Sequence, residues 1–196
     1  TFTVNNTATL GNTASTIGVA NFANARVTTG NANDSITVAG GANSTGITVN
    51  TQAGADTVTL TLATALSNAG NTYNAGTNTT GTVDTLSLAY NLAAGSTVDL
   101  AALITAGTIA GFEALTIANP ADGTTTITAG TGFTAYDLVL ANDAGDTVVV
   151  NATAAQANAI TSLVFGATAT SRLTITDGGT VSFASDVLTA VDLVNF

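Results

Sequence analysis

The stretch Asp56-Thr57-Val58-Thr59-Leu60 alternates apolar side chains with hydroxyl side chains directly after a carboxylate. This period of two is typical of a β-strand that buries one face. The same alternation recurs at strand length in residues 36–38, 47–49, 86–88, 115–117, 126–128 and 173–175. A denser apolar run at 147–150 predicts a strand that is covered on both faces. The sequence therefore predicts a protein made mainly of β-strands.

The opening pentad recurs, because Asp34, Asp56, Asp84 and Asp146 each precede a Ser or Thr and then an alternating strand. Intervals of 22 and 28 residues separate the first three, which suits successive coils of a solenoid that present the same corner in register. Clusters of Gly, Asn and Asp between the strands predict tight turns. We therefore expect an all-β fold, a parallel β-solenoid or β-helix. A β-sandwich remains the alternative, since residues 175–181 would also suit a hairpin.

Two smaller features complete the expected architecture. Residues 99–104 and 152–163 are rich in Ala and predict short helical insertions. Residues 19–27 match residues 109–117 in size and polarity, 90 positions apart. This match predicts two related modules, 1–100 and 101–196, which could also be parts of one continuous solenoid domain.

Composition excludes several classes of function. The chain of 196 residues has a formal net charge of -10 and contains no Cys and no His. It therefore has no zinc finger, no Cys nucleophile and no Ser-His-Asp triad. Arg26 and Arg172 are its only cationic side chains, so we expect neither nucleic-acid binding nor attraction to anionic membranes. No stretch of about 18 residues is apolar enough to predict insertion into a membrane.

An enzyme is not expected either. Asp137, Asp143 and Asp146 are close enough in sequence to suggest an acid and base pair of the kind that glycosidases use. However, the chain has no Trp and no Lys, and only three Tyr, so it lacks the aromatic platforms and cations that such sites use. We therefore predict no catalytic residues.

The Asp-containing turns predict a calcium site. Calcium binds six to eight hard oxygen ligands, and stacked turns bring carboxylates, Asn side chains and carbonyl groups of adjacent coils together. The candidate ligands are Asp34, Asp56, Asp84, Asp143 and Asp146. The alternative is that each Asp accepts backbone hydrogen bonds within its own turn.

Part of the chain resembles the calcium-binding RTX repeat, G-G-x-G-x-D-x-U-x. Gly54-Ala55-Asp56-Thr57-Val58 matches its G-x-D-x-U core, and Asn33-Asp34-Ser35-Ile36 is similar to the Asn-Asp variant. The copies here are neither contiguous nor preceded by both glycines. With its Thr, Ala and Asn content, the chain looks more like RTX-related bacterial S-layer proteins and large secreted surface adhesins. That resemblance implies calcium-dependent assembly into a surface lattice.

The expected function is therefore structural. Scarcity of Lys and Arg and absence of Cys suggest a protein that works outside the cell, and the resemblance to S-layer proteins and adhesins implies a bacterial surface. We expect a self-assembling subunit of an S-layer or surface filament, with copies of itself as partners and calcium at its Asp turns. Two alternatives remain open. The chain could be an adhesin module that binds a ligand such as a cell-surface polysaccharide, or a filament subunit whose residues 1–4 pair with a neighbouring subunit.

Overall fold

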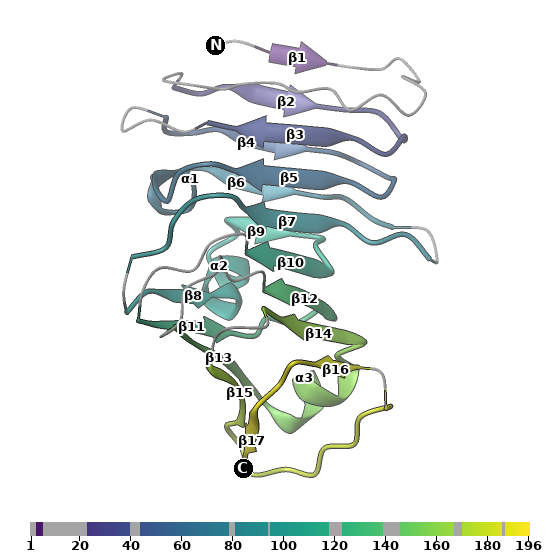
Figure 1. The fold of residues 1–196 in the computed structure, drawn as a ribbon. Coiled ribbons are helices and arrows are strands. Elements are labelled where there is room, and N and C mark those ends of the chain that lie inside the picture. The colour runs from purple at the N-terminus through teal and green to yellow at the C-terminus, as the bar shows by residue number, and fades with distance from the viewer. Residues whose placement is uncertain are drawn as a thin grey trace. The chain divides into compact units, whose positions relative to one another are not determined.

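The computed structural model describes residues 3–5, 23–39, 44–78, 81–93, 95–117, 123–138, 146–166, 170–185 and 187–196. The fold is an all-β solenoid of parallel strands with a few short helices (Figure 1). Its strands are β1 (Thr3–Asn5), β2 (Arg26–Thr28), β3 (Ser35–Val38), β4 (Thr48–Asn50), β5 (Thr57–Leu60), β6 (Thr72–Asn74), β7 (Thr85–Leu88), β8 (Thr97–Asp99), β9 (Ile109–Ala110), β10 (Ala114–Ile117), β11 (Thr124–Thr128), β12 (Ala135–Leu138), β13 (Thr147–Ala152), β14 (Ser162–Phe165), β15 (Thr170–Ile175), β16 (Leu188–Thr189) and β17 (Leu193–Asn195). Its helices are α1 (Thr64–Ser67), α2 (Leu100–Thr105) and α3 (Ala154–Ala159).

The chain divides into two compact units. Unit 1 comprises residues 1–90 and 104–113, and unit 2 comprises residues 91–103 and 114–196. In unit 1, β1, β2, β4, β6 and β9 form one sheet in that order, and β3, β5 and β7 follow one another in a second. In unit 2, β8, β11, β13, β15 and β17 form one sheet, while β10, β12, β14 and β16 follow one another in another.

Every strand pair within either unit that the structure describes is parallel. Parallel neighbours require a full circuit of the chain between them, whereas a sandwich built from hairpins has antiparallel neighbours. The solenoid prediction is therefore confirmed, and the described strands do not form the alternative β-sandwich. β1 comes from the segment proposed to pair with a neighbouring subunit, and here it pairs with β2 of its own chain.

Rows of apolar side chains in register form the core of unit 1. Ile36, Val58 and Leu86 occupy equivalent positions in β3, β5 and β7, and all three are fully buried. The residues between these rows are Ser and Thr, and they remain partly exposed on the outer face. The alternating pattern of the sequence thus becomes an apolar interior and a hydroxyl-rich surface.

Unit 2 repeats this arrangement, with one correction to the sequence prediction. The expectation that residues 147–150 are covered on both faces is wrong. Val148 and Val150 of β13 are buried, whereas Val149 is only half-buried. Val149 lies in register with Thr126 of β11 and Arg172 of β15. These polar neighbours mark the outer face of the sheet, so this strand alternates like the others.

Two of the three helices lie in the Ala-rich segments that predicted them. α2 covers most of residues 99–104, and α3 lies within residues 152–163. α3 begins with a capping box, in which the Thr153 hydroxyl accepts from the Gln156 N–H and the Gln156 side chain accepts from the Thr153 N–H. The four-residue helix α1 was not expected. No helix in the described residues has the length and apolar character needed to cross a membrane.

Candidate functional site

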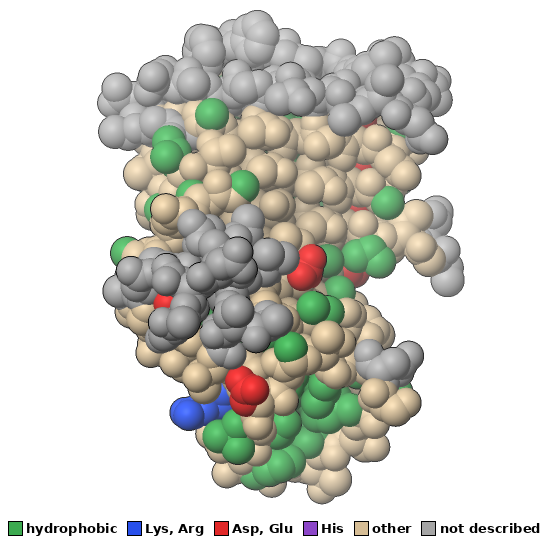
Figure 2. All heavy atoms as spheres, in the orientation of Figure 1, with side chains coloured by type: hydrophobic (Ala, Val, Ile, Leu, Met, Phe, Trp, Pro, Cys, Tyr) green, Lys and Arg blue, Asp and Glu red, His purple; other side chains and the backbone are tan. Residues whose placement is uncertain are grey.

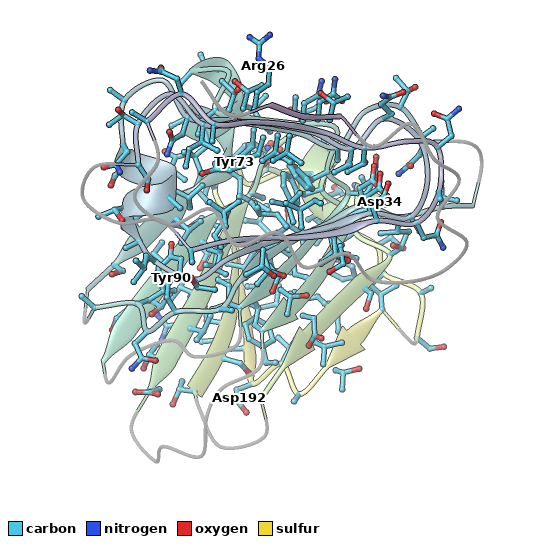
Figure 3. The ribbon with its side chains drawn as sticks, turned by 90° about the horizontal axis from the view of Figure 1, so that it is seen from above. Arg26, Asp34, Tyr73, Tyr90 and Asp192 are labelled. Atoms are coloured by element: carbon cyan, nitrogen blue, oxygen red, sulfur yellow. The ribbon has the colours of Figure 1, made fainter. Side chains whose placement is uncertain are left out.

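Four acidic residues of unit 1 form a column along one corner of the coils. This acidic column consists of Asp34, Asp56, Asp84 and Glu113. The three aspartates precede β3, β5 and β7, which are neighbours in the same sheet. Figure 3 shows Asp34 at this corner, Tyr73 inside the coils and Arg26 pointing away from them. The recurrence of Asp at coil-length intervals in the sequence therefore places three carboxyl groups together, as the spacing predicted.

Each member of the column after Asp34 accepts a hydrogen bond from the backbone of the member before it. The Asp34 N–H donates to Asp56 Oδ1 at 2.7 Å, and the Asp56 N–H donates to Asp84 Oδ1 at 2.7 Å. The Asp84 N–H donates to Glu113 Oε2 at 2.9 Å. In the opposite sense, the carbonyl groups of Asp34, Asp56 and Asp84 accept from Thr57, Thr85 and Glu113. Side chain and backbone together thus fasten each coil to the next.

The second carboxyl oxygen of each aspartate has no partner. Asp34, Asp56 and Asp84 are 5%, 0% and 0% exposed, and the Oδ2 atom of each is buried without a hydrogen bond. Thr51 Oγ1 and Asn78 Oδ1 are also buried and unpaired, and both side chains interact with the column, Thr51 with Asp56 and Asn78 with Asp84. A buried oxygen without a partner costs free energy, so the corner has unused capacity for a proton, a water or a cation.

Burial alters the acidity of two members. Desolvation is the main reason why the pKa of Asp84 rises from 3.8 to about 6, and the carboxylates of Asp56 and Glu113 raise it further. Desolvation also raises the pKa of Asp56, against the lowering effect of the Asp34 N–H and of Thr51. Asp84 is therefore the member of the column most ready to accept a proton near neutral pH.

The five predicted calcium ligands do not form one group. Asp34, Asp56 and Asp84 lie in unit 1, while Asp146 lies in unit 2, where its Oδ1 accepts from the Gly123 N–H at 3.0 Å. Asp143 lies outside the described residues. The unpaired Oδ2 atoms are oxygen ligands of the type that calcium prefers, yet within the described ranges no three acidic side chains are close enough to hold a metal ion. Calcium binding at these turns stays a prediction.

The sequence analysis missed three carboxylates that share this geometry. Glu113 completes the column, Asp177 accepts from the Ala154 N–H at 2.8 Å, and Asp192 accepts from the Ser171 N–H at 2.7 Å. As in the column, each of these carboxylates accepts from a backbone N–H group that lies 21 to 29 residues earlier in the chain. A search for any acidic residue at coil-length intervals would have found them, whereas the search for an Asp before an alternating strand did not.

The raised pKa of Asp84 predicts an unusual dependence of stability on pH. The folded state binds the proton of the Asp84 carboxyl group more tightly than the unfolded chain does. The stability that this proton contributes is therefore fully present below pH 3.8 and is lost as the pH rises through about 6. We expect the melting temperature, followed by circular dichroism, to be higher at pH 5 than at pH 7.5. The variant Asp84→Asn, which mimics the protonated form, should lose most of this difference between pH 7.5 and pH 5, and the remainder is expected from Asp56, whose pKa is also raised.

The matched control is Asp137→Asn, because Asp137 is an exposed aspartate on β12. This variant should keep the pH dependence of the unsubstituted protein. A melting temperature that falls steadily from pH 7.5 to pH 5 would contradict the prediction. Loss of stability on adding a chelator at pH 7.5 would show that a cation, and not a proton, occupies the column.

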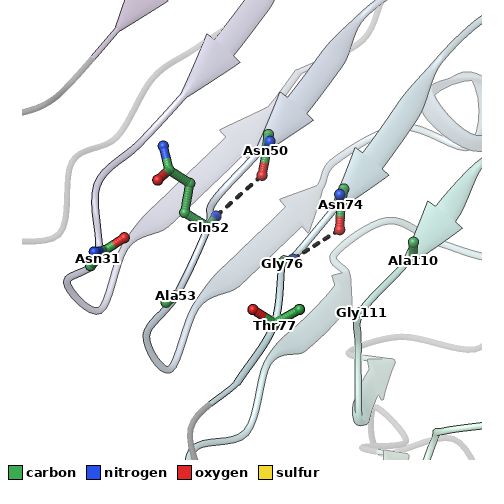
Figure 4. Close-up of a pocket in the computed structure, with 9 residues that line it drawn as sticks. All are labelled: Asn31, Asn50, Gln52, Ala53, Asn74, Gly76, Thr77, Ala110 and Gly111. Carbon is green, nitrogen blue, oxygen red and sulfur yellow. Dashed lines mark hydrogen bonds between the residues drawn. The ribbon is translucent and has the colours of Figure 1, made fainter.

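A second feature of unit 1 is an open groove on the face of β4, β6 and β9 (Figure 4). It has a volume of about 580 Å³, and we call it the amide groove because Asn31, Asn50, Gln52 and Asn74 line it. Ala53, Gly76, Thr77, Ala110 and Gly111 complete its lining. No lining residue carries a charge, so the groove suits a neutral polar ligand rather than an ion.

Comparison with protein-family models, with curated proteins and with solved structures finds no match to this chain. The resemblance to RTX-related S-layer proteins and adhesins therefore stays a prediction. The function has to be inferred from the coils, the column and the groove themselves.

Proposed function

We propose that this protein is a structural, self-assembling extracellular protein, a subunit of a bacterial surface layer or surface filament whose partners are copies of itself. The observation that carries the proposal is a row of apolar side chains that stays partly exposed on the coil of residues 187–196, which contains β16 and β17 and which we call the terminal coil. The low charge of the surface and the resemblance to S-layer proteins support it.

The terminal coil exposes a row of side chains that the preceding coils bury. Leu188 is in register with Leu163 of β14, and Val194 is in register with Leu173 of β15. Leu163 and Leu173 are 0% exposed, whereas Leu188 and Val194 are only half-buried. In the part of the chain that the structure describes, no strand pairs with the outer side of β16 or β17. A further parallel coil would bury this row and pair these strands.

A second copy can supply that coil. Hydrophobic side chains gather over the C-terminal coils in Figure 2. Two residues of the terminal coil, Leu193 and Phe196, are 44% and 75% exposed. Open strand edges next to apolar side chains favour pairing with another chain. A contact between the terminal coil of one copy and a different surface of the next is heterologous, and such contacts build open fibres unless the rotation closes a ring.

Few charged side chains oppose this packing, and all but two of those in the chain are carboxylates. The chain has twelve carboxylates, and among those that the structure describes Asp34, Asp56, Asp84 and Asp146 are buried. The outer faces of the sheets carry mainly Thr, Ser and Asn. Repulsion between neighbouring copies therefore comes from few groups, and divalent ions would screen or bridge those that remain.

The proposal is tested by placing a charge in the exposed row. Val194→Lys should keep the protein monomeric in negative-stain electron microscopy and sedimentation, because stacking would bury an ammonium group. The control Thr189→Lys adds the same charge to the outer face of the same coil, where Thr189 is exposed, and should assemble like the unsubstituted protein. Assembly of Val194→Lys, or monomers of the unsubstituted protein at every concentration, would contradict the proposal.

The same samples test the calcium part of the proposal. We expect sheets or fibres with millimolar calcium and their loss with excess chelator. Assemblies that are indifferent to the chelator would keep the structural role and remove calcium from it.

An adhesin module is the second candidate, and the amide groove favours it. An adhesin binds its ligand without assembling. A protein that stays monomeric in the micrographs and binds a polysaccharide would therefore support this candidate over the first.

A further inference from the structure

The amide groove has donors held at fixed positions on successive coils. Asn50 ends β4 and Asn74 ends β6, and the two are register partners. Asn50 Oδ1 accepts from the Gln52 N–H at 3.3 Å, and Asn74 Oδ1 accepts from the Gly76 N–H at 2.9 Å (Figure 4). These bonds fix both amide groups by their oxygens. Each Nδ2 group is left without an acceptor among the described residues and so can donate to a ligand.

The neighbouring turns form a floor of exposed backbone. Gly76 and Gly111 both have positive φ angles, of 89° and 78°. A Cβ on Gly76 would lie 1.5 Å from the Gln52 carbonyl oxygen, and one on Gly111 would lie 2.6 Å from the Gly76 carbonyl oxygen. The stacked turns therefore have no room for side chains at these two positions, and this close packing of adjacent coils fixes the backbone that lines the groove.

Acceptors complete the lining. The Gln52 Nε2 group donates to the Thr29 carbonyl at 2.7 Å, which anchors the side chain by its nitrogen and leaves Oε1 available. The Thr77 hydroxyl and the Asn31 amide are exposed at the edges. The groove thus presents donors and acceptors together, a mixture that matches hydroxyl groups, which both donate and accept.

Spacing and charge narrow the class of ligand. Adjacent parallel strands are about 4.8 Å apart, so the two Asn amides repeat along the stacking direction at a distance comparable with one sugar ring. The groove has no charged residue, and the chain has a net charge of -10, so a polyanion is disfavoured.

We propose that the amide groove is a carbohydrate site that binds a neutral polysaccharide chain lying across successive coils, with Asn50 and Asn74 donating to its oxygens. This goes beyond the structural role, because a subunit that only assembles needs no ligand. The open groove lacks aromatic platforms, so we expect weak binding, with a Kd on the order of 1 mM for a short oligosaccharide.

The test replaces only the two donors. Asn50→Asp and Asn74→Asp retain Oδ1 as the acceptor for the turn and exchange the donating amide nitrogen for an oxygen. Binding of cellohexaose and maltohexaose is measured by ¹H–¹⁵N NMR, which detects side-chain amides directly, on dispersed protein kept below the concentration at which it assembles. We expect chemical-shift changes at the groove amides with at least one of these probes. The double Asp variant should weaken that binding by at least about tenfold while its melting temperature is retained.

The control Thr59→Asp adds a carboxylate on the outer face of β5, which belongs to the other sheet of unit 1, and should bind like the parent. Absence of binding by both neutral probes would overturn the proposal. So would binding that survives the double substitution, or tighter binding of an oligogalacturonate, which is anionic. None of these results alters the assembly measured by microscopy, so the two proposals fail independently.

Discussion

Gly76→Ala should destabilise the protein more than any other exchange of glycine for alanine among the described turns. The new Cβ would lie 1.5 Å from the Gln52 carbonyl oxygen of the adjacent coil, so backbone must move against backbone. A positive φ of 89° adds the strain of a left-handed residue. Together these effects should lower the free energy of unfolding by about 3–5 kcal/mol, measured by urea denaturation.

Gly81→Ala is the matched control. Gly81 has a φ of 97°, but a Cβ there would have no neighbour within 4 Å. It therefore isolates the backbone strain, and we expect a loss of about 1–2 kcal/mol. Equal effects of the two substitutions would show that the turns of adjacent coils are not packed as closely as the structure has them.

Asn71→Ala should have the second largest effect. Asn71 is 3% exposed and joins three backbone groups, since its Oδ1 accepts from the Ile47 N–H while its Nδ2 donates to the carbonyls of Ser44 and Ala65. These carbonyls keep other donors, the Asn68 amide and the Tyr73 hydroxyl. The buried Ile47 N–H would lose its side-chain acceptor. We expect a loss of about 3–4 kcal/mol in urea denaturation.

Asn158→Ala provides the comparison for Asn71. Asn158 also joins two coils, accepting from the Ser182 N–H at 2.8 Å and donating to the Thr180 carbonyl at 3.0 Å, but it is exposed. Water can replace both bonds, so the loss should stay below about 1 kcal/mol. A loss as large as that of Asn71→Ala would mean that burial does not decide the cost of these bonds.

The strands were predictable because their signal is local. Thr57 to Leu60 alternates in sequence as it does in burial, and the repeated Asp located the corner where β3, β5 and β7 begin. The dense run of valines led to the wrong prediction that Val149 is covered. The composition of one strand does not show that Thr126 and Arg172 lie beside Val149 on the outer face of the sheet. Which faces are exposed depends on register, which the sequence of one strand does not contain.

The contacts between coils were less predictable. The sequence placed Asp34, Asp56 and Asp84 at one corner, but it did not show that their carboxylates accept backbone hydrogen bonds from the previous coil, or that Glu113 follows them. The amide groove was not predicted at all. Asn50 and Asn74 are ordinary turn residues in sequence, and they become neighbours only because coils of unequal length return to the same register.

The carboxylate bonds between coils that the structure describes all run in one direction. In the column, and again at Asp146, Asp177 and Asp192, the acceptor belongs to the later coil and the N–H donor to the earlier one. A chain that emerges from the ribosome or a secretion channel N-terminus first therefore leaves each coil unfastened until the following coil has appeared. Completion of these bonds is vectorial, and it lags synthesis or export by about one coil.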